Sequence, residues 1–230
     1  MKELVLSIGE PFTSPAWGSN FVMFSAEEKA VIQEEDAREY LRRICKYARR
    51  YEVYLIPQRF EMMGTLCMCL ISPQGRVIGA QKAAYLHLPS VYERGDSLEV
   101  LRTEFGGVFL CVDVDIYHPQ IHRIAANMGA QYLFCAQSIE ALDYDNNMVV
   151  TGIWNAAQSG GFYAVAVSQQ FHCVCAPLAL TPKEDGFLAA PTRRTPLSVR
   201  MQADDLLSSL PPRRRLSRKL YAVHRGDLLE

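Results

Sequence analysis

Two aspartates and a cysteine alternate with apolar residues in the segment GGVFLCVDVDIYHPQIHR, residues 106–123. Side chains along a strand point alternately to its two faces, so Cys111, Asp113 and Asp115 are predicted to share one face of a strand. A thiolate is a strong nucleophile, and a carboxylate can act as a general base or as a nucleophile in transfer reactions. The segment is therefore a candidate site for nucleophilic or acid–base chemistry.

The elements around this segment alternate between strand-like and helix-like patterns, which predicts an α/β domain with layered sheets and helices. The candidate strand runs into HPQIHRIAANMGA, where a proline near the first turn and a closing glycine predict a short helix. Further helices are predicted over residues 26–51 and around 151–160. Strands or extended segments are predicted over residues 2–10, 52–60, 62–72, 76–88, 108–116, 132–138, 162–171 and 172–180.

Composition limits the classes of function that the chain can have. It has 230 residues, 49% of them hydrophobic, which is enough for a single domain spanning residues 1–230 with a full core. The net charge of −1 gives no overall field for nucleic acid or an anionic membrane, so neither is expected as a partner. No apolar run approaches the roughly 18–20 residues of a membrane span, and the start does not read as a signal peptide. Seven cysteines scattered through apolar segments indicate reduced thiols and predict a cytoplasmic protein.

The C-terminal part, from about residue 195 to residue 230, is more polar and is predicted to be an extension that contacts another copy of the chain. Its segment PPRRRLSRKLY is basic, but it lacks interleaved aromatic residues on a chain of near-zero net charge. A solvated edge or an oligomer arm is the favoured interpretation.

Several motifs in this order of elements resemble the nitrilase superfamily, the carbon–nitrogen hydrolases. The resembling segments cover nearly the whole chain: SPQGRVIGAQKAAYL, FGGVFLCVDVDIYHPQIHR, NMGAQYLFCAQS and RRRLSRKLY. The resemblance implies a four-layer αββα sandwich, and a Glu–Lys–Cys triad in which the thiolate forms a covalent acyl-enzyme. It also implies homo-oligomers, no cofactor and no catalytic metal.

The nucleophile position of the family falls on Asp113 when the motifs are matched without a gap. Counting back from Pro119 and Arg123 gives the same position as counting forward from Phe105. Cys111 can take that position only with a two-residue insertion after it. The ungapped reading, in which aspartate has replaced the cysteine, is favoured.

The other members of the triad also match imperfectly. Lys82 stands one residue before the family's lysine position, which here is Ala83, and a slip of one residue turns a strand side chain to the opposite face. Glu10 matches the general base that ends the family's second strand, which implies that the first strand and its helix are missing. Glu93 matches a second family glutamate.

Two classes of function follow from the resemblance. The first is a nitrilase-like protein with a degenerate triad that binds a small amide, nitrile or amine-type ligand, or a partner protein. The alternative is an active amidase or carbamoyl hydrolase that uses Cys111 as nucleophile or Asp113 as base. Whether the chain is an enzyme stays open at this point.

The carboxylates near the nucleophile position lead to one further expectation. Glu10, Glu93, Asp113 and Asp115 are predicted to converge as an acidic cluster, with Lys82 as the only counter-charge. Repulsion in such a cluster would make Asp113→Asn stabilising. His118 and His122 have the i, i+4 spacing of metal ligands, but a metal site is the minority interpretation because Pro119 is expected to begin the helix.

Overall fold

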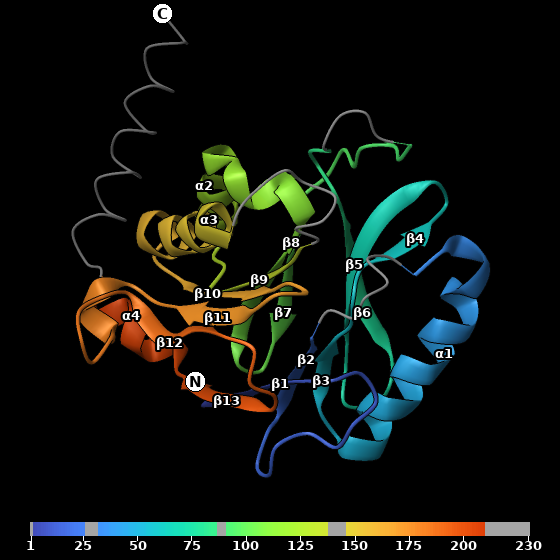
Figure 1. The fold of residues 1–230 in the computed structure, drawn as a ribbon, viewed down its shortest axis with the longest axis horizontal. Helices are drawn as coiled ribbons and strands as arrows, with labels where there is room; N and C mark the ends of the chain where they lie inside the picture. The colour runs from blue at the N-terminus through green and yellow to red at the C-terminus, as the bar shows by residue number, and fades with distance from the viewer. Residues whose placement is uncertain (1, 26–31, 87–90, 138–145, 210–230) are drawn as a thin grey trace, which may run out of the picture.

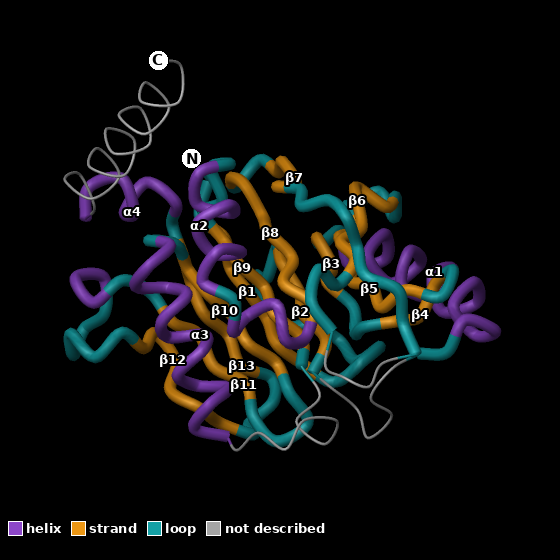
Figure 2. Tube along the Cα trace, turned by 90° about the horizontal axis from the view of Figure 1, so that it is seen from above, coloured by secondary structure: helices purple, strands orange, loops and turns teal. Residues whose placement is uncertain are grey.

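The computed structural model describes residues 2–25, 32–86, 91–137 and 146–209. Two β-sheets pack face to face, and helices cover the outer face of each sheet (Figure 1). The layers are one helix, a first sheet, a second sheet and a pair of helices, which is the predicted αββα order. Figure 2 shows the second sheet from above, with its strands side by side.

The first sheet has seven strands among the described residues, in the order β13-β1-β2-β3-β5-β4, with β6 also paired to β5. They are β1 (Leu4–Gly9), β2 (Phe21–Phe24), β3 (Tyr54–Ile56), β4 (Phe60–Met62), β5 (Thr65–Ile71), β6 (Val77–Lys82) and β13 (Leu197–Met201). The inner strands β1, β2 and β3 run parallel to one another. Such central strands are buried on both faces, which explains why β2 is apolar at every position.

The second sheet has six strands among the described residues, in the order β12-β11-β10-β9-β8-β7. They are β7 (Val100–Thr103), β8 (Gly106–Val112), β9 (Tyr132–Ala136), β10 (Tyr163–Val167), β11 (His172–Cys175) and β12 (Phe187–Thr192). Strand β8 lies parallel to β9, and Cys111 pairs with Cys135 in this register.

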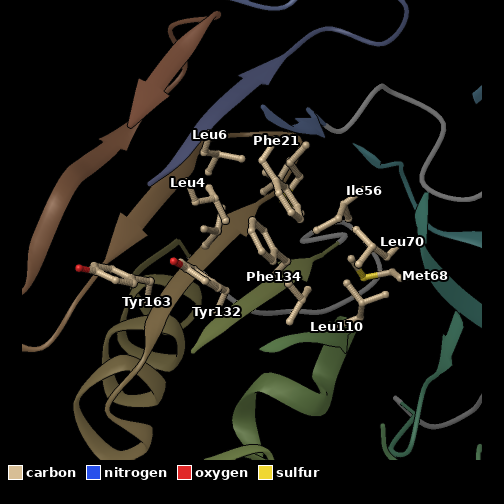
Figure 3. Close-up of a cluster of buried hydrophobic side chains, with 14 of the residues drawn as sticks. Leu4, Leu6, Phe21, Ile56, Met68, Leu70, Leu110, Tyr132, Phe134 and Tyr163 are labelled. Carbon is tan, nitrogen blue, oxygen red and sulfur yellow. The ribbon is translucent and has the colours of Figure 1, made fainter. Parts of the chain in front are cut away.

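The space between the two sheets is filled by large apolar side chains (Figure 3). Phe21 of β2 stacks on Phe134 of β9 with ring centroids 5.2 Å apart. Leu6 and Leu110 lie in the same cluster, one from each sheet. Burial of this apolar surface joins the sheets and fixes which ends of the strands face each other.

Helices complete the outer layers. Helix α1 (Glu34–Tyr51) buries Ile44 and Ala48 against the first sheet, whereas α2 (Pro119–Asn127) and α3 (Asn146–Gly160) cover the second sheet. The remaining helical segments are the 3-10 turns η1 (Asp113–Tyr117) and η2 (Leu178–Leu180) and the short α4 (Ala203–Ser209). No helix in the described ranges is long and apolar enough to cross a membrane.

Two sequence-based predictions about the elements need correction. The strand predicted over residues 108–116 ends at Val112, because the chain turns sharply at Asp113 into η1. Cys111, Asp113 and Asp115 therefore do not share one face of a strand. Strand β2 was missed, and residues 10–20 join it to β1 without a helix.

The predicted C-terminal extension is partly a component of the domain. Residues 197–201 form β13, which pairs antiparallel with β1 inside the first sheet. The segment PPRRRLSRKLY lies outside the described residues, as do residues 26–31 of the helix predicted over residues 26–51, whose described part begins at Glu34.

Candidate functional site

A sharp strand-to-helix turn at Asp113, called the elbow below, is the local feature that a reactive group would need. Strand β8 ends at Val112, and Asp113 opens η1 with a φ of 52°. A non-glycine residue at positive φ costs free energy and is held only where the surrounding structure fixes it. Such strained turns at the end of a strand present a side chain away from the sheet, as in the nucleophile elbow of α/β-hydrolases.

The carboxylate of Asp113 forms an ion pair with Arg59. Nη1 of Arg59 lies 2.9 Å from Oδ2 of Asp113. The side chain of Arg59 is 4% exposed and that of Asp113 is 13% exposed. Arg59 precedes β4, so the pair joins the first sheet to the elbow on the second. Sequence reasoning missed Arg59, although a lone cation at the end of the apolar run EVYLIPQRF was a usable signal.

Tyr92 lies beside this ion pair. Burial and the charge of Glu61 raise the pKa of its hydroxyl, while the positive charge of Arg59 opposes the rise, and Gln33 shares a side-chain hydrogen bond with it. The carboxylate of Asp113 also contributes to the raised pKa of Tyr92. The cluster thus contains a cation, two carboxylates and a phenol that interact with one another.

The backbone of the elbow is fixed by β9. The side-chain amide of Gln137 donates a hydrogen bond of 3.1 Å to the carbonyl oxygen of Asp113, and the thiol of Cys135 approaches the same oxygen at 3.8 Å. Both residues are buried. Gln137 therefore supports the turn without taking part in the ion pair, and it is a second residue that sequence reasoning missed.

Asp115 fastens the elbow to the chain that follows β6. Its carboxylate accepts hydrogen bonds from the backbone amides of Tyr85 at 2.7 Å and Ala84 at 3.2 Å. The side chain is buried, and burial raises its pKa to about 6 although these hydrogen bonds favour the charged form. Asp115 thus has a structural role: it connects the elbow of the second sheet to the chain that follows β6 of the first sheet.

Cys111 lies in the helix-facing layer of the second sheet. Its side chain is fully buried in the cluster that contains Ile121 of α2 and Ile153 of α3. Burial raises the pKa of the thiol well above its ordinary value. A neutral thiol packed under helices is a poor nucleophile, which disfavours the alternative in which Cys111 attacks a substrate.

Lys82 and Ala83 lie on opposite faces of the end of β6. Lys82 pairs with Cys67, whose side chain belongs to the layer under α1, and Lys82 itself is exposed. Ala83 is fully buried in the core between the sheets. The position that the resemblance assigns to the lysine thus carries a methyl group.

The two matched glutamates are exposed. Glu10 follows β1, and its carbonyl oxygen accepts a hydrogen bond from the hydroxyl of Thr13. Glu93 is held through its backbone amide, which donates to the carbonyl oxygen of Gly64.

The predicted acidic cluster was wrong for the described part of the chain. No group of three or more His, Cys, Asp or Glu residues there could hold a metal ion. Asp113 faces the cation Arg59, and Asp115 faces backbone amides. The nearby histidines have other contacts: His122 is buried with Nε2 at 2.8 Å from the carbonyl oxygen of Ile116, and His118 stacks on Tyr85.

Comparison with known proteins gives a match at the level of structure. No protein-family model and no curated protein matches the sequence. A carbon–nitrogen hydrolase from Helicobacter pylori G27 is similar in structure, with a TM-score of 0.73 and 16% identity over 99% of this chain and 98% of that one. An amidase from Nesterenkonia sp. gives a TM-score of 0.68 and 15% identity over 94% of this chain and 96% of that one.

A variant of the Nesterenkonia amidase in complex with butyramide is also similar in structure. The match has a TM-score of 0.66 and 16% identity, and it covers 94% of this chain and 96% of the amidase chain. That amidase is assigned to the nitrilase superfamily. The chain has the nitrilase fold. Both chains are covered almost completely in each comparison. In the Nesterenkonia amidase the acetamide moiety of fluoroacetamide adds covalently at an active-site cysteine.

Proposed function

We propose that this nitrilase-fold protein binds a small ligand at the elbow and does not hydrolyse it through an acyl-enzyme. The observation that carries the proposal is the residue at the elbow, which is an aspartate paired with a buried arginine. A carboxylate is a weak nucleophile toward an amide, and its acyl product would be an anhydride. A carboxylate held by a guanidinium is also a weaker base than a free one.

The environment of the elbow supports the same conclusion. The lysine position is filled by Ala83 in the core, and Lys82 is exposed on the other face of the strand. Arg59 supplies a positive charge at the elbow, but this charge is already paired with Asp113. On this proposal, an internal ion pair occupies the position where the resemblance places the nucleophile.

The expected ligand is a small amide, with nitriles and amines as related candidates. A carboxylate accepts hydrogen bonds and a guanidinium donates them, so Asp113 and Arg59 together offer both polarities. An amide carries an N–H donor and a carbonyl acceptor and can satisfy both groups. A nitrile or an amine can satisfy only one of them.

The proposal is tested by measuring binding and chemistry on the same samples. Calorimetry with a panel of small amides, nitriles and amines should give saturable binding that is lost in Arg59→Met/Asp113→Asn. Ammonia release should stay at background, and intact mass should show no acyl adduct. The matched control is Lys82→Met, which removes an exposed charge away from the elbow and should leave binding unchanged.

Fluoroacetamide provides the complementary test of position. The wild-type protein should take up no acetamide group, whereas Asp113→Cys should be labelled at residue 113 by peptide mapping. An adduct on the wild-type protein that disappears in Cys111→Ser would contradict the proposal and make the chain an active amidase.

A further inference from the structure

From Tyr40 to its end, helix α1 carries exposed cations and no acidic residue, whereas its first turns also carry the exposed acids Glu34, Glu35, Asp36 and Glu39. Its cations are all exposed: Arg38, Arg42, Arg43, Lys46, Arg49 and Arg50. No acidic residue lies between Glu39 and Glu52. Helix α1 forms the outermost layer on one side of the molecule, opposite α2 and α3, so this face is open to solvent (Figure 1).

Four of these cations form a single row along the helix. Arg38, Arg42, Lys46 and Arg50 are each four residues apart, which places neighbours about 5–6 Å from one another. Like charges at this spacing destabilise a helix. The row therefore costs stability, and a cost of this kind is typical of residues retained for binding.

The guanidinium groups beside and within the row are held by neutral partners. Arg43 lies over the ring of Phe12 at 4.1 Å, and Arg50 lies over the ring of Tyr51 at 5.3 Å. Arg49 donates a hydrogen bond of 3.1 Å to the carbonyl oxygen of Gln74. Within the part of the chain that the structure describes, no carboxylate forms an ion pair with any cation of α1. The positive charges are ordered but not neutralised.

The face offers charge and no apolar anchor. The large apolar residues of α1 point to the first sheet, and none of them is among the exposed hydrophobic residues of the described chain. Protein interfaces depend on buried aromatic or aliphatic anchors, and an interfacial membrane helix needs an apolar face. Binding of a phosphate backbone needs neither, because release of counterions supplies the free energy and arginine matches phosphate geometry.

We propose that the outer face of α1 binds the phosphate backbone of nucleic acid without sequence preference. This surface is separate from the elbow and independent of the proposed ligand. The net charge of −1 argued against such a partner, but a sum over the chain does not describe the local charge of α1 after Glu39, where only cations occur. The expected affinity is that of non-specific binding, with Kd on the order of 10⁻⁶ to 10⁻⁴ M at physiological salt.

The test uses the full-length protein and a fluorescent DNA duplex in anisotropy titrations. The variant Arg42→Glu/Lys46→Glu is compared with Arg194→Glu/Arg200→Glu, which makes the same change in net charge at exposed positions outside α1. The first should weaken binding at least tenfold and lower the slope of log K against log salt by about two. The control should bind like the wild type. Melting curves verify folding, and the α1 variant should be at least as stable because it removes like-charge neighbours.

Three results would overturn the proposal. They are no binding by the wild-type protein at low salt, equal binding by the α1 variant and the control, and equally tight binding of a polyglutamate peptide. The last result would assign the face to an acidic protein segment instead of nucleic acid.

Discussion

Asp113 combines two features that each cost free energy in a folded protein, a left-handed backbone and a largely buried charge. The pairing with Arg59 offsets the second cost, and the amide of Gln137 holds the first. Removing one member of such a pair leaves the other charge buried without compensation. This reverses the expectation from sequence, which treated Asp113 as a repelled carboxylate.

Asp113→Asn should therefore destabilise the protein by about 3 kcal/mol or more at neutral pH. Asparagine tolerates positive φ, so the loss reports on the charge rather than on the backbone. Urea unfolding of the wild type, Asp113→Asn, Arg59→Met and the double variant Arg59→Met/Asp113→Asn gives the coupling energy between the two side chains. The double variant should recover much of the loss, and a stabilised Asp113→Asn would refute the role of the ion pair.

Asp115 predicts how stability depends on pH. Its folded-state pKa of about 6 lies above the unfolded value, so the folded protein holds more protons between these values. The contribution of Asp115 to the free energy of unfolding should fall by up to about 3 kcal/mol as pH rises from ~4 to ~6, then level off. Urea titrations across this range should give a slope that is flatter in Asp115→Asn. An identical slope in that variant would contradict the assignment.

At the scale of elements, the turn between β5 and β6 depends on close contact with α1. Gly75 has a φ of 71°, and a Cβ atom there would lie 2.5 Å from the carbonyl oxygen of Cys45. Gly18 has a similar φ of 79° in the β1–β2 loop but no atom within 4 Å of the same point. The two glycines share a backbone cost and differ in steric cost.

Gly18→Ala should cost about 1–2 kcal/mol, the penalty of a left-handed residue, and Gly75→Ala should cost at least about 1 kcal/mol more. Denaturant midpoints of the two variants measured side by side give the difference. Equal losses would mean that the turn can move away from α1 without cost.

Elements were more predictable from sequence than the contacts between them. Pro119 marked the start of α2 correctly, because proline favours the first turn of a helix. The alternation of VDVDI predicted a strand, but an alternating pattern of polar and apolar residues does not reveal the left-handed turn that Asp113 adopts. Arg59 could not be connected to Asp113 from sequence, because their contact depends on how the two sheets pack. The fold class came from motifs and order, whereas the chemistry of the site came from tertiary pairing.

At the scale of the whole molecule, we propose that the chain forms a homodimer through the outer helices of the second sheet. Exposed apolar residues lie at the outer helices of the second sheet: Ile124 on α2, Met128 directly after α2, and Met148 on α3. These helices pack against each other, so the residues can form one interface.

Light scattering at micromolar concentration should give a dimer for the wild type and a monomer for Ile124→Lys/Met128→Lys. Val91→Lys changes a residue that is 90% exposed outside these helices and should remain dimeric. A monomeric wild-type protein would contradict this expectation.

Six of the seven cysteines are buried, and Cys45 alone is partly accessible. A thiol reagent can therefore modify little of the native protein, but it can modify every cysteine of an opened chain. The rate at which the buried cysteines are labelled therefore measures how often the folded chain opens, and no probe has to be introduced. In an oxidising solution, opening becomes irreversible when the open chain forms a disulfide between cysteines that lie far apart in the folded protein, because such a chain cannot regain the native packing.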